Sequence, residues 1–302
     1  MVPTFNRPKG LATAIQSILN QSYPNIEIVV VNDCGPDVRD VVSQLNENGN
    51  IRYIRHSENR GLAATRNTGV KAAHGKYIAY LDDDDFYYPN HIETLVGFLE
   101  STDHKFAYTD AYRASQKLVN GELVTTKRDA AYSCDFDEDV ILSCNFIPVL
   151  CVMHEKSCID EVGCFDELLK AHEDWDLWIR MSRAFPFGHI KKITCEFTWR
   201  DDGGTMTSGS QAEYLRTQEV IYDKYSGHSK DKPRKGGYRT RFPAFRARSI
   251  KTRFTRKRTC AQAICSIILA ATKTPPKSIK TDLPATRTCR RALPRWVIAI
   301  SN

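Results

Sequence analysis

The sequence predicts an α/β fold built on a mostly parallel sheet. Two observations lead to this class: strand and helix signals alternate through the N-terminal half, and polar residues follow the ends of two predicted strands. Neither G-x-G-x-x-G nor G-x-x-x-x-G-K-[ST] occurs in the chain. A Rossmann dinucleotide site and a P-loop kinase are therefore not supported.

The predicted elements follow in a regular order. An apolar helical stripe covers residues 11–20, and the strand Ile26–Val31 ends at a turn over residues 32–36. Residues 62–73 predict a second helix, closed by Gly75, and residues 77–81 predict a buried strand with aromatic and β-branched side chains. Pro89 predicts the start of a third helix that runs to about Glu100, because proline suits the first helical turn.

Four consecutive aspartates, Asp82–Asp85, come directly after the strand of residues 77–81. Crowded carboxylates raise one another's pKa, so such a run is costly unless it binds a cation. Oxygen ligands suit Mg²⁺, which shares its shell with substrate phosphates. The alternative is a polar loop with helix-capping aspartates. In a parallel sheet Asp33 and this run lie at the same carboxyl edge, where α/β folds bind ligands, so one ligand can touch both.

Six short motifs then occur in a recognisable order. They are P-T-F-N-R at residues 3–7, Q-S-Y-P-N-I-E-I at 21–28, V-N-D-C-G at 31–35, N-R-G with A-T-R-N-T-G at 59–69, L-D-D-D-D-x-x-x-P at 81–89, and E-D-W-D-L-W at 173–178. Over roughly residues 2–210 the chain resembles glycosyltransferase family 2 enzymes of the bacterial cell-surface polysaccharide type. The resemblance implies a GT-A fold, a single nucleotide-diphospho-sugar transferase domain whose mixed, mostly parallel sheet is flanked by helices.

The resemblance also implies roles on the donor side. Asp33 would hydrogen-bond the nucleobase, typically uracil N3–H, and Pro3 and Thr4 would line the nucleoside pocket. Asp83 would contact the ribose region, and Arg66 would lie on the nucleotide side, although a surface helix arginine is the alternative. Within the acidic run, Asp84 together with Asp82 would bind Mg²⁺ or Mn²⁺ on the diphosphate.

On the acceptor side, Asp174 matches the catalytic base, against the alternative of a carboxylate that favours a helix N-terminus. Glu173 and Trp175 belong to the same acceptor-side motif, although Trp175 and Trp178 can instead pack the helix. The acceptor pocket would form from residues 145–151, 163–166 and 173–178. Arg200 matches the diphosphate-side cation of a closing loop, in which Thr205 and Thr207 stand at hydroxyl positions and Asp202 stands near a metal-binding histidine position. A plain turn is the alternative for this segment.

The chain departs from the family pattern in two places near its start. Only Met1 and Val2 precede the P-T motif, where the family has a first strand of about five residues, so the first strand is expected to be truncated. Asn32 replaces the first aspartate of the V-D-D motif.

Charge divides the chain into two regions. Residues 1–225 carry 23 Lys and Arg against 34 Asp and Glu, a net charge of −11, whereas residues 226–302 carry 20 against 2, a net charge of +18. We therefore expect a transferase domain over 1–225 and a basic tail over 226–302. Such a tail suits peripheral contact with an anionic membrane; disorder or a fragment of a further region is the alternative. No nucleic-acid motif accompanies the charge.

The ten cysteines include no C-x-x-C pair and no zinc-finger spacing. They predict reduced, mostly buried thiols and a cytoplasmic protein, placed at the inner face of the membrane if the tail binds there. No signal peptide or spanning segment is visible.

Together these features predict an inverting, metal-dependent glycosyltransferase. It would move a sugar from a nucleotide sugar, a UDP-sugar by preference, to a hydroxyl of a glycan or lipid-linked acceptor. A nucleotidyltransferase shares the strand-end carboxylates, although the Glu173–Asp174 motif argues against it. An inactive nucleotide-sugar-binding module is the other alternative.

Overall fold

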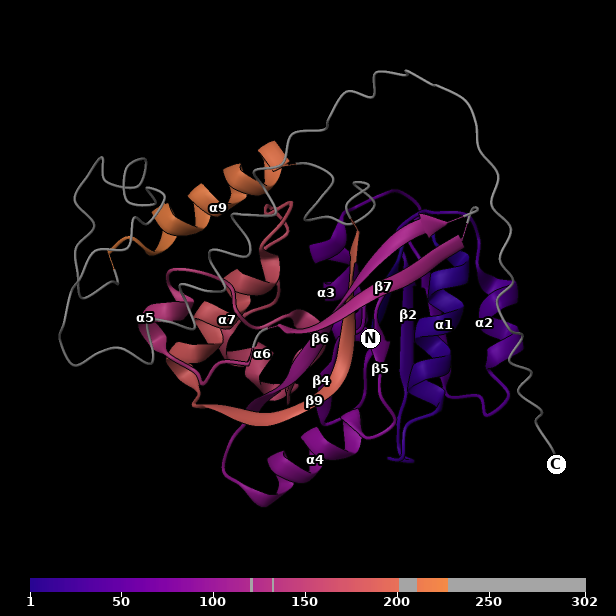
Figure 1. The fold of residues 1–302 in the computed structure, drawn as a ribbon, viewed down its shortest axis with the longest axis horizontal. Coiled ribbons are helices and arrows are strands. Elements are labelled where there is room, and N and C mark those ends of the chain that lie inside the picture. Colours follow the sequence, from indigo (N-terminus) through magenta and orange to yellow (C-terminus); the bar gives the residue numbers. More distant parts are fainter. Residues whose placement is uncertain (120–121, 132, 201–210, 228–302) are drawn as a thin grey trace, which may run out of the picture.

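The computed structural model describes residues 1–119, 122–131, 133–200 and 211–227 (Figure 1). The expectations for Asp202, Thr205 and Thr207, and those for the tail from residue 228 onward, lie outside these residues. Within the described parts of the chain, no helix is long and apolar enough to cross a membrane.

The N-terminal third alternates strands and helices around a parallel sheet. Its elements are β1 (Val2–Thr4), α1 (Pro8–Leu19), β2 (Ile28–Asn32), α2 (Arg39–Leu45), β3 (Ile51–Arg55) and α3 (Leu62–Ala72). The strand order is β1-β2-β3, with Val30 of β2 opposite Val2 on one side and Tyr53 on the other. Every residue of β2 is buried, as expected for an interior parallel strand covered on both faces.

A second sheet continues from the first. It contains β4 (Tyr77–Ala79), β5 (Phe86–Tyr87), β6 (Phe106–Val119), β7 (Glu122–Ala131), β8 (Val152–Glu155) and β9 (Phe187–Arg200), in the order β4-β8-β6-β9-β5 with β7 paired to β6. β6 and β9 run parallel, and the other pairs are antiparallel. The backbone of Met1 bonds to Ala79 and Leu81, which joins the two sheets.

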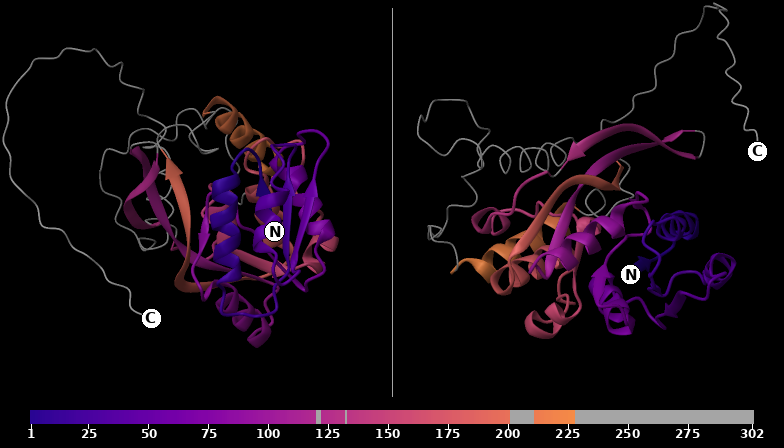
Figure 2. Two further views of the ribbon diagram at one scale, coloured as in Figure 1. Left: turned by 90° about the vertical axis from the view of Figure 1, so that its right-hand side faces the viewer. Right: turned by 90° about the horizontal axis from the view of Figure 1, so that it is seen from below.

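The remaining helices cover the sheets and one end of the molecule. They are α4 (His91–Ser101), α5 (Glu138–Ile141), α6 (Ser157–Val162), α7 (Glu173–Ala184), α9 (Gln211–Tyr225) and the 3₁₀ turn η1 (Val149–Cys151). In Figure 1, α1 and α2 lie on one side of the sheets, and α5, α7 and α9 lie on the other. The ribbon of β6 and β7 extends beyond the body in both views of Figure 2.

The structure confirms the predicted α/β class and the predicted elements, with small shifts at their ends. The parallel pairing predicted for most of the sheet is found in β1-β2-β3, whereas four of the five strand pairs of the second sheet are antiparallel. The strand expected over residues 77–81 pairs as β4 only to Ala79, and the helix expected from Pro89 begins at His91. The first strand, β1, has three residues, and all three are buried. The seven described cysteines are all free, and four of them are buried.

Candidate functional site

One cleft of about 450 Å³ opens at the carboxyl ends of the N-terminal strands. It brings together nine of the residues predicted from the sequence. These are Pro3, Thr4, Asp33, Arg66, Asp82, Asp83, Asp84, Glu173 and Asp174. The convergence follows from topology, because parallel strands deliver the loops after their carboxyl ends to one edge of the sheet.

Asp33 follows β2 and organises the loop before α3. Its carboxylate accepts hydrogen bonds from the backbone N–H groups of Arg60 (2.9 Å) and Gly61 (2.8 Å) and from His56 Nδ1 (2.8 Å). Gly61 has a φ of 88°, a conformation that glycine adopts without strain. Asp33 therefore fixes the turn that begins α3 while it lines the cleft.

Asn32, the departure from the family pattern, is buried and is not among the residues that line the cleft. Its amide nitrogen donates to the Pro36 carbonyl (2.8 Å) and to the Tyr53 hydroxyl (3.1 Å), and its amide oxygen accepts from Gly35 N (2.8 Å). An amide suits this position because an ionised carboxylate has no hydrogen to donate. The replacement therefore serves the β2 turn.

Asp83 and Asp84 are held from the first strand and from β9. Asp83 accepts from the Thr4 hydroxyl (2.8 Å) and from Arg7 (3.0 Å), and Asp84 pairs with Arg7 at 2.8 Å and with Arg200 at 3.3 Å. Burial raises the pKa of Asp83. The pKa of Asp84 rises to about 6, because burial and the neighbouring aspartates outweigh the attraction of Arg7 and Arg200. Arg200 thus lies beside the acidic run.

Arg66 joins the acidic run to the start of α7. One guanidinium nitrogen donates to both carboxylate oxygens of Asp82, at 2.8 and 3.0 Å, and another donates to Glu173. Arg66 is buried rather than on the helix surface. Burial alone would lower its pKa, but Asp82 and Glu173 raise it. Burial raises the pKa of Glu173 to about 7, although Arg66 opposes the shift.

Asp85 is the last residue of the same run and also lines the cleft. Its carboxylate accepts from Thr198 N at 2.9 Å, and the Thr198 hydroxyl donates to the Asp84 carbonyl at 2.5 Å. Burial, followed by Asp84 and Asp82, raises the pKa of Asp85 well above its ordinary value. The run is therefore anchored to β9 at one end and to Arg66 at the other.

The donor set of the acidic run fits a hard divalent cation only in part. Asp82 and Asp84 both line the cleft, and Asp82 is close enough to raise the pKa of Asp84, which is the crowding that a cation relieves. Across the described ranges, no group of three or more His, Cys, Asp or Glu side chains has the arrangement of a metal centre. Two carboxylates would therefore leave most of the shell to diphosphate oxygens and water.

Asp174 lies in the first turn of α7, on the wall of the cleft. The amide nitrogen of Asn145 donates to Asp174 Oδ2 at 3.0 Å, while Asn145 Oδ1 accepts from Ile147 N at 3.2 Å. The other oxygen, Oδ1, accepts from Trp175 N at 2.7 Å. Both carboxylate oxygens are therefore oriented by neutral donors, and the side chain stays partly exposed.

Trp175 is placed in the core. Its side chain is 1% exposed and is not part of the cleft lining, and its indole N–H donates to the Ile141 carbonyl. Trp178 is likewise buried and donates to the Ile147 carbonyl at 3.2 Å. Both indoles therefore pack α7 against the segment of residues 141–147, which corresponds to the packing alternative for the two tryptophans.

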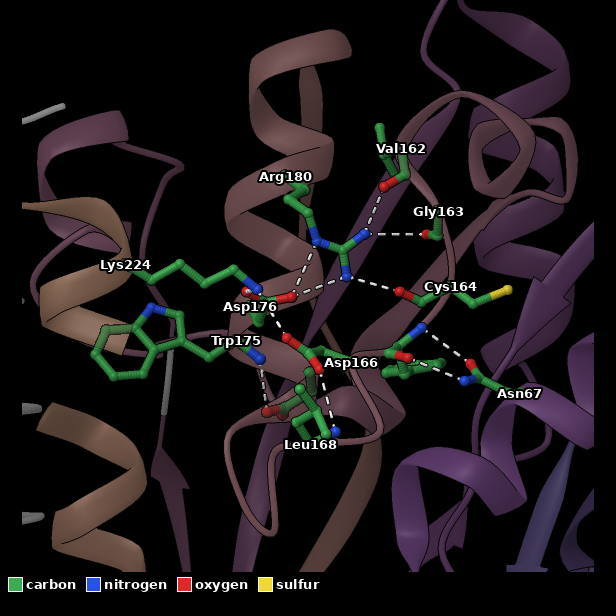
Figure 3. A network of polar contacts seen from close by, with 12 residues as sticks. Asn67, Val162, Gly163, Cys164, Asp166, Leu168, Trp175, Asp176, Arg180 and Lys224 are labelled. Atoms are coloured by element: carbon green, nitrogen blue, oxygen red, sulfur yellow. Dashed lines mark hydrogen bonds and ion pairs between the residues drawn. The ribbon is translucent and has the colours of Figure 1, made fainter. Parts of the chain in front are cut away.

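A polar network surrounds the fully buried Asp176 of α7 (Figure 3). Asp176 pairs with Arg180 at 2.9 Å and with Lys224 of α9 at 2.8 Å. Arg180 also donates to the carbonyls of residues 162, 163 and 164 at the end of α6. Asn67 of α3 exchanges hydrogen bonds with the backbone of Phe165. The loop after α6 is thereby tied to α3, α7 and α9.

Several cleft residues were not predicted from the sequence, and Arg7, His172 and Tyr214 are the most informative of them. Arg7 belongs to the first motif. A run of four aspartates needs a counter-ion, and this need is the signal by which Arg7 could have been found. His172 precedes the Glu173 motif, and Tyr214 lies on α9. No local signal marks Tyr214, because only the packing of α9 brings it to the cleft.

Several bacterial proteins similar to this chain are described as glycosyltransferases. The *Bacillus subtilis* protein described as uncharacterized glycosyltransferase YwdF is 33% identical over 229 residues, which cover 74% of this chain and 82% of the relative. The *Escherichia coli* putative colanic acid biosynthesis glycosyl transferase WcaA is 29% identical over 60% of this chain and 64% of its own. The chain spans 29% and 37% of the length of two uncharacterized glycosyltransferases from *Rickettsia bellii* and *Rickettsia felis*.

Solved structures share the fold. *Staphylococcus aureus* TarS in complex with UDP-GlcNAc superposes with a TM-score of 0.58 at 19% identity, over 73% of this chain and 64% of that one. The *Pyrobaculum calidifontis* mannosyltransferase PcManGT, in complex with GDP-Man and Mn²⁺, gives a TM-score of 0.55 at 15% identity, over 76% and 64%. At these identities the likeness shows the fold, which is that of GT-A glycosyltransferases. Residues 1–151 match the family described as Glycosyl transferase family 2, and the chain belongs to that family.

Proposed function

We propose that the protein transfers one sugar from a UDP-sugar to a hydroxyl of a glycan or lipid-linked acceptor, with inversion at the anomeric carbon. One observation carries this proposal: a single cleft is lined both by Asp33 with the run Asp82–Asp84 and by Asp174. TarS is described in complexes with UDP and UDP-GlcNAc, and WcaA with colanic acid biosynthesis, which supports a UDP-sugar donor and a role in polysaccharide biosynthesis.

The nucleoside would lie against β1 and β2. Pro3 and Thr4 would flank it, Asp83 would reach its ribose, and Asp33 would accept a hydrogen bond from the base. An ionised carboxylate offers about four acceptor positions. Asp33 uses three of them on Arg60, Gly61 and His56, so one remains for a nucleobase N–H.

The diphosphate would lie over the acidic run. Asp84 together with Asp82 would hold Mg²⁺ or Mn²⁺ there, and a bound divalent ion neutralises charge as the nucleoside diphosphate leaves. Arg200 adds positive charge beside Asp84, at 3.3 Å from its carboxylate. Arg7 pairs with the same carboxylate, and its positive charge offsets part of the negative charge of the acidic run that would otherwise repel an anionic donor.

Asp174 would accept the proton of the attacking hydroxyl. A general base must lie within hydrogen-bond reach of the proton that it removes, and Asp174 is the carboxylate of α7 that is partly exposed in the cleft. Glu173 is committed to Arg66, so it supports the site rather than reacting. One base and one leaving group suffice for a single displacement, which inverts the anomeric carbon.

The test is a screen of UDP-glucose, UDP-galactose, UDP-N-acetylglucosamine and GDP-mannose for release of the nucleoside diphosphate with Mg²⁺ or Mn²⁺. We expect metal-dependent hydrolysis of at least one UDP-sugar. Tight binding of UDP with no hydrolysis or transfer from any donor would instead identify an inactive binding module. Release of pyrophosphate from a nucleoside triphosphate would identify a nucleotidyltransferase.

A further inference from the structure

Two aromatic side chains stand beside Asp174 on the wall of the cleft. His172 directly precedes α7, and Tyr214 lies on α9. Their ring centroids are 4.1 Å apart with an interplanar angle of 56°, and both rings line the cleft. Residues 42 positions apart in the chain therefore form one aromatic corner next to the candidate base.

The corner is built rather than incidental. His172 has a φ of 63°, in the left-handed region that few residues other than glycine adopt, so surrounding contacts must hold it there. Its Nε2–H donates to the Tyr214 carbonyl at 3.1 Å, and its ring forms a T-shaped pair with Trp175, with ring centroids 5.4 Å apart. Burial lowers the pKa of His172, so the imidazole is neutral at pH 7 and its Nδ1 is an acceptor.

The helix that carries Tyr214 is fixed to the body of the protein. Lys224 pairs with Asp166 and Asp176 at 2.9 and 2.8 Å, and the Tyr225 hydroxyl donates to Asp176 at 2.7 Å. Tyr222 donates to the Ser143 carbonyl at 2.9 Å. A ring on such a helix loses little freedom on binding, which favours recognition.

Charge restricts what this end of the cleft accepts. Glu173 and Asp174 lie beside the aromatic corner, and among the described residues that line the cleft the Lys and Arg side chains are those of Arg7 and Arg66. Each of these two arginines pairs with two carboxylates. The net negative charge here would therefore repel a phosphate-bearing acceptor, whereas it would not repel a neutral sugar.

We propose that His172 and Tyr214 form an acceptor subsite that binds a neutral pyranose ring by its apolar face. The acceptor is then a neutral glycan sugar rather than a phosphate-bearing molecule such as a polyol phosphate. The C–H face of the sugar covers the tyrosine ring, which buries apolar area on both partners, and the ring hydroxyls reach Asp174 and Asn145. This inference rests on the proposed function, since it names the acceptor class for the same cleft.

The experiment uses saturation-transfer NMR on the full chain with UDP and Mg²⁺. The probes are methyl β-D-glucopyranoside, methyl β-D-galactopyranoside and methyl N-acetyl-β-D-glucosaminide, with glycerol 3-phosphate as the polyol phosphate. We expect ring-proton saturation for at least one glycoside and none for glycerol 3-phosphate. Tyr214→Ala should weaken glycoside binding by about tenfold or more, and Tyr214→Phe, which keeps the ring, by less than about threefold.

Leu215→Ala is the matched control, because Leu215 is the next residue on α9 and is 46% exposed. It should leave glycoside binding unchanged, and circular dichroism verifies that all three variants fold. Equal glycoside binding by Tyr214→Ala and wild type would overturn the subsite, as would loss of binding in Leu215→Ala or saturation of glycerol 3-phosphate alone. Calorimetric titration of UDP with Mg²⁺ separates the two claims: nucleotide binding without a Tyr214-dependent glycoside signal contradicts the subsite only, whereas no nucleotide binding by wild type contradicts the proposed function itself.

Discussion

Arg66 and Glu173 form a buried ion pair between residues 107 positions apart, and it connects the helix before the acidic run to the helix that carries Asp174. Both side chains are almost fully buried, and Arg66 also holds Asp82. The pair therefore links α3 and the acidic run, on one side of the cleft, to the start of α7, which carries Asp174.

Removing this arginine should destabilise the whole domain. In Arg66→Met, Glu173 and Asp82 lose their shared cation, and loss of one partner from a buried pair costs about 3–5 kcal/mol. Urea unfolding measures the change. Arg60→Met is the control, because Arg60 is exposed and meets Glu167 at 3.5 Å, so its loss should cost less than about 1 kcal/mol. Equal losses in the two variants would show that Arg66 does not connect the helices.

Asn145 should act on the rate through Asp174. Asn145→Ala removes a hydrogen bond to a carboxylate, and such bonds contribute about 1.5–3 kcal/mol, so kcat should fall by about tenfold or more. The KM for the donor should stay unchanged, because Asn145 orients Asp174, the proposed general base, and does not orient the nucleotide. Ser143→Ala, an exposed neighbour, is the control. A changed donor KM with normal kcat would place Asn145 on the donor side instead.

Acid should destabilise the fold through His154. This fully buried imidazole accepts from the Tyr80 hydroxyl at 2.8 Å, and burial lowers its pKa to about 4 from 6.5. Between pH 4 and 6.5 the unfolded chain therefore binds a proton on His154 and the folded chain does not. The contribution of His154 to the free energy of unfolding is fully present above pH 6.5 and is lost as the pH falls toward 4. The shift corresponds to about 3 kcal/mol.

Unfolding free energies of wild type and His154→Gln at pH 7.5, 6.0 and 4.5 measure this loss. The difference in unfolding free energy between wild type and His154→Gln should narrow as pH falls, because the wild type loses the His154 contribution and glutamine does not titrate. A gap that stays constant over this range would exclude His154 as the source.

Metal dependence should disappear with Asp84. In Asp84→Asn the proposed site loses one of its two carboxylates, so Mn²⁺ should no longer strengthen UDP binding. Calorimetric titration of UDP with and without Mn²⁺ measures the enhancement, and the exposed Asp103→Asn provides the control. Full enhancement in Asp84→Asn would place the cation elsewhere.

The sequence predicted the cleft better than it predicted the second sheet. Asp33 and the run Asp82–Asp84 follow apolar strands, and strand ends converge by topology alone, so their meeting could be foreseen. β3 was missed because its sequence I-R-Y-I-R has no strict apolar/polar alternation, and only Ile51 in it is fully buried. The parallel pairing of β6 with β9 joins segments about 80 residues apart, for which no local pattern exists.

Side-chain partnerships were the least predictable part of the site. Arg66 was expected on the nucleotide side, yet its partners Asp82 and Glu173 come from two other motifs. Tyr214 reaches the cleft only because Lys224 and Tyr225 fix α9 to Asp176. These relationships depend on distances between packed elements, which spacing in the sequence does not encode.

The central claim is that Asp174 is the base of a sugar-transfer reaction, and one comparison tests it most directly. Nucleoside diphosphate release from the UDP-sugar found in the donor screen is measured for wild type, Asp174→Asn and the exposed control Asp160→Asn, together with UDP binding. Removing a general base lowers the rate by about 10²–10⁴-fold, so we predict that the rate of nucleoside diphosphate release falls by this factor in Asp174→Asn. The affinity of Asp174→Asn for UDP should be unchanged, and Asp160→Asn should have the wild-type rate. Turnover near the wild-type rate in a folded Asp174→Asn protein would contradict the account.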